Sequence, residues 1–240
     1  MSIVGEVSRA FAEAGVDLER WGLAWARAMP TVALVPAFGL RAMPTPARGV
    51  LGMVLALSIF PAMAPPSGPA ASLPWIALAG IELVRGLPIA IAAAVPLWAA
   101  TMAGGAVDAL RGSNDAAQYP VIEGRATPLG VPLGLFASFV FLAQGGPSRV
   151  ALALATQPPS AHPAVAIAHD LSSGIGLAVA VAAPLLAASV VLEVAGALIA
   201  RAASPSQVHA IFSPLRSLGV LCIFALVFDR IVGFLAAAIV

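Results

Sequence analysis

The sequence predicts an all-α, polytopic integral membrane protein that forms a single membrane-embedded domain over residues 1–240. Its composition carries this prediction, because 60 % of the residues are hydrophobic and only 10 % are charged, against about 25 % charged in an ordinary soluble domain. The mean hydropathy is +0.99. A soluble domain of this size could not bury so much apolar surface in its core. Lipid or partner proteins must therefore cover it.

Charged or proline-rich interruptions divide the chain into about six hydrophobic helical segments. The first twenty residues mix acidic, basic and apolar side chains, which does not match a cleavable signal. Residues 1–27 are therefore predicted to be a retained N-terminal amphipathic segment. The hydrophobic segments follow at 29–40, 49–64, 75–107, 129–143, 171–200 and 217–240.

Several of these segments are poor candidates for a straight membrane-spanning helix. Segment 29–40 offers twelve residues before Arg41, whereas a straight span needs about twenty. Prolines, each of which removes a backbone donor and favours a kink, interrupt other segments at Pro88, Pro96, Pro132 and Pro184. Broken helices persist at membrane depth only where neighbouring protein satisfies the freed backbone groups. We therefore expect kinked hairpins that pack on other subunits more than on lipid.

Four charged residues within or beside the apolar segments are candidates for assembly or gating. Glu82 and Arg85 are three residues apart, so they share a helix face and should pair. Glu193 lies in the apolar stretch 185–200, where a carboxylate usually faces a partner or a water-filled path. A pairing of Glu193 with Arg201 or with another subunit is favoured over a proton relay, because the chain offers few other titratable groups for such a pathway.

Motifs for catalysis are nearly absent. The best candidate cluster combines a base with hydroxyl nucleophiles: His169, Asp170, Ser172 and Ser173. Helix capping is the favoured interpretation of these residues, because a helix is predicted to start near Leu171. The chain has no lysine and so lacks the phosphate-binding lysine motif, and it has no basic face for nucleic acid. We predict no enzymatic activity, catalytic residue, cofactor or metal site, and no nucleic-acid partner.

A polar insert at 108–128 separates the third and fourth hydrophobic segments. It holds the only tyrosine and the only asparagine of the chain. Gly112, Pro120 and Gly124 are backbone breakers, which predicts an irregular loop. Its central seventeen residues, 111–127, are long for a connection, and long loops are often functional. An ordinary connector is the alternative interpretation.

Three stretches of the chain share the order and spacing of a known family. The first, ELVRGLPIAIAAAVPLWAATMAGGAVDALRG at 82–112, has a Pro-Leu-Trp-Ala step and ends in Asp-x-x-Arg-Gly. The second, TPLGVPLGLFASFVFLAQGG at 127–146, begins with Pro-Leu and ends with Gly-Gly. The third, at 183–221, carries Glu193 and restarts at Pro-Leu-Arg-Ser. Together they cover more than a third of the chain and resemble the SctT family of type III secretion export-gate proteins, whose flagellar counterpart is FliR.

The resemblance implies one non-enzymatic, multi-pass subunit of a helical export gate in the bacterial inner membrane. Its implied partners are membrane lipid, several copies each of two smaller subunits of the SctR and SctS type, and a switch subunit of the SctU type. The gate would pass unfolded secretion substrates into a needle, with energy from an ATPase and the proton-motive force elsewhere in the machine.

The resemblance also implies that the polar insert enters the central pore as a plug. The candidate plug residues are Arg111, Gly112, Asn114, Tyr119, Pro120, Val121, Ile122, Gly124 and Arg125. The alternative from a different class is an independent polytopic transporter of small solutes, in which discontinuous helices form a site at the membrane midplane. Such a transporter predicts an internal repeat between the two halves, and none is evident in the sequence.

Overall fold

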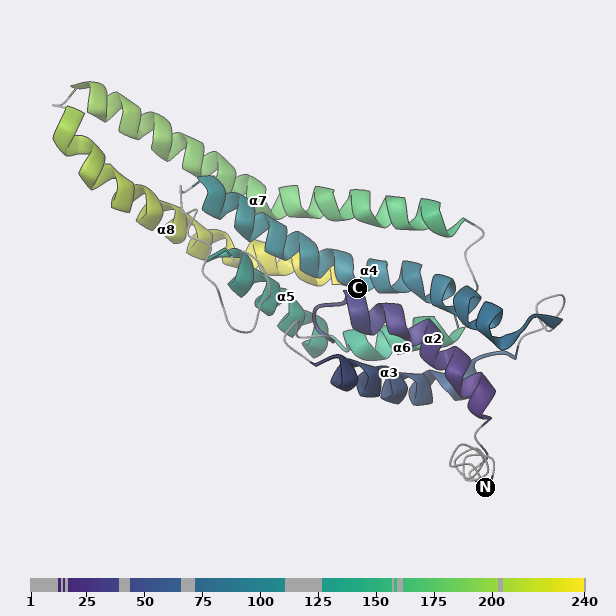
Figure 1. The fold of residues 1–240 in the computed structure, drawn as a ribbon. Helices are drawn as coiled ribbons and strands as arrows, with labels where there is room; N and C mark the ends of the chain where they lie inside the picture. The colour runs from purple at the N-terminus through teal and green to yellow at the C-terminus, as the bar shows by residue number, and fades with distance from the viewer. Residues whose placement is uncertain are drawn as a thin grey trace. The chain divides into compact units, whose positions relative to one another are not determined.

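The computed structural model describes residues 13, 15, 17–38, 44–65, 72–110, 127–156, 158, 162–202 and 205–239. All regular elements among these residues are helical, which confirms the predicted all-α class. The elements are, in chain order, α2 (Leu18–Leu34), α3 (Thr45–Ile59), the 3-10 helix η1 (Phe60–Ala62), α4 (Trp75–Leu110), α5 (Gly130–Ala143), α6 (Gly146–Thr156), α7 (Pro163–Ala202) and α8 (Pro205–Ile239) (Figure 1).

Among the described residues, four helical stretches are long and apolar enough to cross a membrane. They are Thr45–Ala62, Trp75–Ala109, Pro163–Ala202 and Ser217–Ala238. Helices α5 and α6 pass the same test only as a pair, which is bent by 66° at the break between them. Gly145 lies at this break with φ of 72°, a left-handed conformation that favours glycine. The protein is thus a polytopic membrane protein, in which α5 and α6 form either a broken span or a re-entrant loop.

Two predicted connections are shorter than the sequence indicated. The stretch between the predicted segments 129–143 and 171–200 contains α6 and the first two turns of α7, and the stretch between 171–200 and 217–240 contains the start of α8. Pro163 and Pro205 are the first residues of α7 and α8. Proline is accepted there because the first N–H groups of a helix have no intrahelical partner. These prolines therefore begin helices and do not interrupt them.

The first half of the apolar run predicted at 29–40, residues 29–34, is the end of a longer helix, α2. Asp17 begins this helix, because its Oδ1 accepts hydrogen bonds from the backbone N–H groups of Glu19 at 3.0 Å and Arg20 at 3.4 Å. The helix then continues to Leu34. It therefore joins the end of the predicted amphipathic segment to the first apolar run.

The chain forms two compact units, to both of which α4 and α7 contribute. Unit 1 comprises residues 1–94 and 142–171, and unit 2 comprises residues 95–141 and 172–240. In unit 1, α2 packs on α3, and both α3 and η1 pack on α6. The buried side chains of these elements are small or branched and include Leu23, Ala24, Ala28, Val32, Ala56, Ile59 and Leu154.

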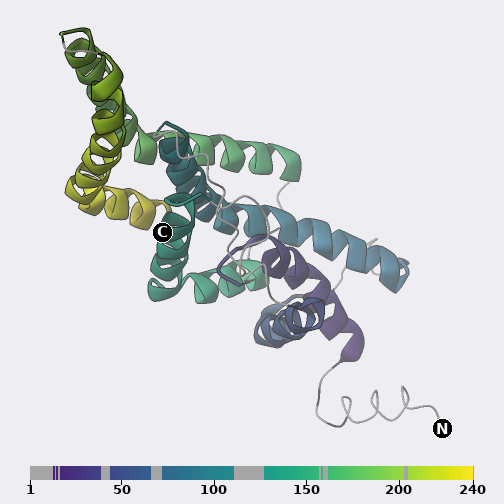
Figure 2. The ribbon, with the colours of Figure 1, turned by 60° about the vertical axis from the view of Figure 1, so that its left-hand side comes forward.

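Unit 2 contains the second half of α4, α5, most of α7 and α8. Helices α4 and α5 approach closely, because a Cβ built on Gly104 would lie only 2.5 Å from the Cα of Gly130. The rings of Phe136 in α5 and Phe228 in α8 are 5.1 Å apart. The second half of α7 and the first half of α8 lie side by side as a hairpin (Figures 1 and 2).

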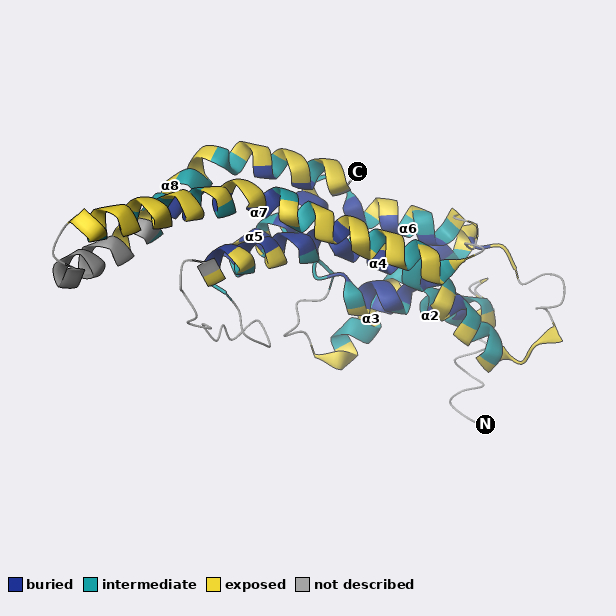
Figure 3. Ribbon diagram, turned by 90° about the horizontal axis from the view of Figure 1, so that it is seen from above, coloured by how far each residue is buried: buried dark blue, intermediate teal, exposed yellow. Residues whose placement is uncertain are grey.

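Much of the apolar surface stays uncovered within this single chain. In each of the four candidate spans, only 17 % to 22 % of an apolar 18-residue window is buried, and exposed residues recur along both α7 and α8 (Figure 3). The exposed large apolar residues of α7 are Val165, Leu171, Ile175, Val179, Val190, Val191, Val194, Leu198 and Ile199. Such an extended apolar surface requires lipid or partner proteins to cover it.

Candidate functional site: a buried charge cluster and the base of the polar insert

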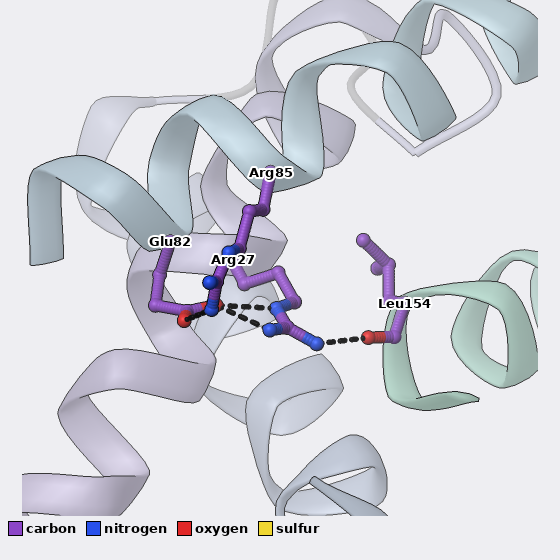
Figure 4. Close-up of polar contacts among 4 residues, drawn as sticks. All are labelled: Arg27, Glu82, Arg85 and Leu154. Atoms are coloured by element: carbon purple, nitrogen blue, oxygen red, sulfur yellow. Dashed lines mark hydrogen bonds and ion pairs between the residues drawn. The ribbon is translucent and has the colours of Figure 1, made fainter. Parts of the chain in front are cut away.

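A buried ion-pair cluster in unit 1 centres on Glu82 of α4. Its Oε1 accepts from Arg85 Nη1 at 2.6 Å, so the pairing expected from their spacing is present. Its Oε2 accepts from Arg27 of α2, from Nε at 2.6 Å and from Nη2 at 2.5 Å (Figure 4). Both carboxylate oxygens of Glu82 thus accept charge-assisted hydrogen bonds, which are the strong ones.

Arg27 links three helices through this cluster. In addition to its bonds to Glu82, its Nη1 donates to the backbone carbonyl of Leu154 in α6 at 2.8 Å (Figure 4). The side chains of Glu82 and Arg27 are 7 % and 13 % exposed, whereas that of Arg85 is 37 % exposed. Two guanidinium groups face one carboxylate, so the cluster carries one excess positive charge at the exposed edge of Arg85.

A glycine allows the two helices of this cluster to cross closely. A Cβ built on Gly86 of α4 would overlap the carbonyl oxygen of Arg27 and would lie 3.0 Å from its carbonyl carbon. Both atoms belong to the backbone of α2, so they cannot move aside as a flexible side chain could. Gly86 therefore sets the distance at which Arg27 reaches Glu82.

The helices that flank the polar insert are joined in unit 2. Asp108, at the end of α4, is completely buried, and its Oδ2 accepts from the backbone N–H of Leu129 at 2.6 Å. The Oγ1 of Thr127 accepts from the N–H of Gly130, the first residue of α5, at 3.1 Å. The nine candidate plug residues, from Arg111 to Arg125, lie outside the described residues.

The other predicted polar residues lie on α7. Glu193 and Arg201 are both exposed in this chain, and Arg201 lies in the last turn. His169 and Asp170 lie inside the helix, with Nδ1 and Oδ1 3.7 Å apart. The helix-capping interpretation of the cluster at 169–173 is therefore wrong, because the helix begins two turns earlier at Pro163. The described residues contain no group of three His, Cys, Asp or Glu that could hold a metal ion.

Sequence reasoning missed two partners in these sites. Arg27 was not assigned to the Glu82 pair, since 55 residues separate the two. A usable signal was present, because Glu82 and Arg27 are charged residues beside or within apolar runs that need a buried partner. The hydrogen bond from Leu129 to Asp108 uses a backbone N–H as its donor, so the type of residue at position 129 gives no indication of it.

Comparison with known proteins gives one result for nearly the whole chain. The family model of the bacterial export proteins, family 1, matches residues 18–239. A search of curated proteins found no match.

Proposed function

The chain belongs to the bacterial export proteins, family 1, which is the FliR and SctT family, and we propose on this basis that it is the SctT-type subunit of a type III secretion export gate. The family match over residues 18–239 is the observation that carries this proposal. In this role the protein is a non-enzymatic, multi-pass component of the bacterial inner membrane. It helps to form the channel through which unfolded protein substrates leave the cytoplasm.

The exposed surface of the chain supports a role inside an assembly. An apolar 18-residue window in each of its four candidate spans is less than a quarter buried, and the pair α5 and α6 is too strongly bent to be a simple span. Broken spans require neighbouring protein to satisfy their free backbone groups. We propose that these neighbours are subunits of the SctR and SctS type, with a switch subunit of the SctU type nearby.

We further propose that the polar insert closes the pore of this gate. Its apolar side chains, such as Tyr119, Val121 and Ile122, would pack against loops of the partner subunits, while Arg111 and Arg125 lie near the rim. The length of the insert and its content of the only tyrosine and asparagine support this role.

Shortening the insert tests the plug. Replacement of Asn114–Gly124 by a few glycines should let small ions or dyes leak through the membrane when the full gate is present, while the gate still assembles. A control that keeps the full length but replaces Tyr119, Val121 and Ile122 by serine separates side-chain packing from loop length. An assembled gate that stays sealed after the shortening would show that the insert is only a linker.

Secretion in the host tests the role of the whole subunit. Removal of this chain should abolish export of type III substrates, and a plasmid copy should restore it. The partner membrane subunits should still be made but should no longer assemble into a closed complex. Normal export without this chain would contradict the proposed function.

A further inference from the structure

Two opposite charges lie on the surface of α8, in an otherwise apolar part of the helix. Asp229 and Arg230 belong to the candidate span Ser217–Ala238, which contains no other charged residue. Both are exposed, and within the described part of the chain neither forms a hydrogen bond or an ion pair. The span therefore presents one carboxylate and one guanidinium group to whatever surrounds it.

Both charges lie near the middle of this span. At about 1.5 Å per residue, Asp229 is about 18 Å from the first residue of the span and about 14 Å from the last. Long basic side chains near the end of a span can reach the membrane surface, whereas charges within it pair or face the interior of a protein assembly. Successive residues of a helix do not face each other, so Asp229 and Arg230 do not neutralise each other. Each of them needs its own counter-charge.

Burial distinguishes the two sides of α8. Val220, Ile231 and Leu235 are at most 1 % exposed, and the ring of Phe228 packs on that of Phe136 in α5 at 5.1 Å. These residues form the side that faces the rest of unit 2. The opposite side, which we call the outer face of α8, consists of the exposed residues Cys222, Leu226, Asp229, Arg230, Gly233 and Ala237. They recur at intervals of three or four positions, as residues on one side of a helix do.

The middle of the outer face is open enough for a second helix to approach closely. Leu226 is 83 % exposed, and a Cβ built on Gly233 would meet nothing within 4 Å. Small residues such as glycine let the backbones of two membrane helices come close together. At about 100° per residue, Asp229 and Arg230 lie on either side of the line from Leu226 to Gly233. A helix placed along this line would therefore lie between a carboxylate and a guanidinium group.

We propose that the outer face of α8 binds one membrane helix of a neighbouring subunit, which is apolar except for a basic side chain that pairs with Asp229 and an acidic one that pairs with Arg230. This inference rests on the proposed function, in which the chain is assembled with other gate subunits. Hydrocarbon provides no counter-ion, so lipid does not satisfy the two charges. Two charges of opposite sign also determine the direction and register of the bound helix, because the wrong alignment brings like charges together.

A photo-cross-linker on the outer face tests this contact. The complex is co-expressed with the SctR-type and SctS-type subunits, with p-benzoylphenylalanine in place of Leu226, and is irradiated in membranes. We expect a cross-link to one helix of one of these subunits, identified by mass spectrometry of the linked peptide. That helix should carry one basic and one acidic residue within about one turn of the linked position.

Charge reversals then test the pairing itself. Asp229→Arg should lower the cross-link yield at least about tenfold, because it places like charges together. The matched control is Arg149→Glu, which reverses an exposed charge on α6 and should keep the yield. Reversal of the partner's basic residue should restore the yield in Asp229→Arg. The corresponding arm combines Arg230→Glu with reversal of the partner's acidic residue.

The outcomes separate this inference from the proposed function. If the wild-type chain forms no complex with the other subunits, the proposed function itself fails. If the complex forms but Leu226 links to no helix with this pair of charges, only the inference is wrong. A linked product with two copies of this chain, or a disulfide between two copies of Cys222 after oxidation, would also overturn it.

Two further results would contradict the pairing. If Asp229→Leu combined with Arg230→Leu assembles and cross-links like wild type, the two charges do not select the partner. If Asp229→Arg is defective and reversal of the partner's basic residue does not rescue it, Asp229 acts within its own chain. Rescue excludes simple misfolding of the variant, because a change in another subunit would not refold it.

Discussion

Replacement of Gly86 by alanine should separate α2 from α4 and weaken the Glu82 cluster. The new Cβ would overlap the carbonyl oxygen of Arg27 and would lie 3.0 Å from its carbonyl carbon, whereas carbon atoms in contact lie about 3.5–4.0 Å apart. Because the overlap with the oxygen is deeper than the approach to the carbon, the helices must move apart by at least about 1 Å. The bond from Arg27 Nε to Glu82, now 2.6 Å, would lengthen toward about 3.6 Å, at which it is no longer a hydrogen bond.

The cost follows from this movement. Overpacking of a well-packed site costs about 1–3 kcal/mol, which lowers the midpoint of thermal unfolding by about 2–12 °C in a chain of this length. The matched control is Gly80→Ala on the same helix, where an added Cβ meets nothing within 4 Å. Alanine in a helix is favoured over glycine by about 0.5–1 kcal/mol, so the control should be neutral or more stable.

The assay compares both variants in the assembled complex in detergent, with tryptophan fluorescence recording the midpoint of thermal unfolding. A second comparison places Gly86→Ala in an Arg27→Ala background. In that background the new Cβ still overlaps the backbone of residue 27. The loss of stability caused by moving the Arg27 guanidinium away from Glu82 is absent, so Gly86→Ala should cost less there. If Gly86→Ala and Gly80→Ala have the same midpoint, the close crossing of α2 and α4 is refuted.

Three further substitutions test other contacts. Glu82→Ala should destabilise the complex by about 3–5 kcal/mol, because it leaves the largely buried Arg27 without a counter-charge. Glu82→Gln should cost less. Equal midpoints of thermal unfolding for wild type and Glu82→Ala would show that the cluster does not stabilise the complex. Trp75→Phe removes the hydrogen bond from Nε1 to the carbonyl of Glu19 at 3.2 Å and should lower stability by about 1 kcal/mol in the same thermal assay. Glu193→Gln should largely preserve secretion, because the amide still forms hydrogen bonds, whereas a loss that follows the imposed proton gradient would indicate a proton relay.

The helices that the sequence predicts well are those with long apolar runs. The region predicted at 75–107 is α4, and the span predicted at 129–143 is α5 to within one residue, because charged or polar residues follow or precede each run. Helix α6 is not evident from the sequence, since its apolar stretch is short and prolines flank it. Proline marks helix starts as well as helix ends, and the sequence alone does not separate these cases.

In the candidate sites, contacts between residues close in sequence could be predicted, whereas contacts between residues distant in sequence could not. The pair of Glu82 and Arg85 could be predicted because helical periodicity places residues three apart on one face. The bond from Arg27 to Glu82 depends on the crossing of two helices at Gly86, and the bond from Leu129 to Asp108 depends on how α5 packs on α4. No local pattern fixes either crossing, so these contacts appear only in the folded chain.

Co-expression with its proposed neighbours tests the central claim most directly. Expressed alone, the chain should be unstable or aggregate, because its broken and exposed spans have no protein to pack against. Co-expressed with the SctR-type and SctS-type subunits, it should purify as one defined complex with one copy of this chain, as measured by native mass spectrometry. A stable, monodisperse monomer that transports small solutes in liposomes would contradict the account.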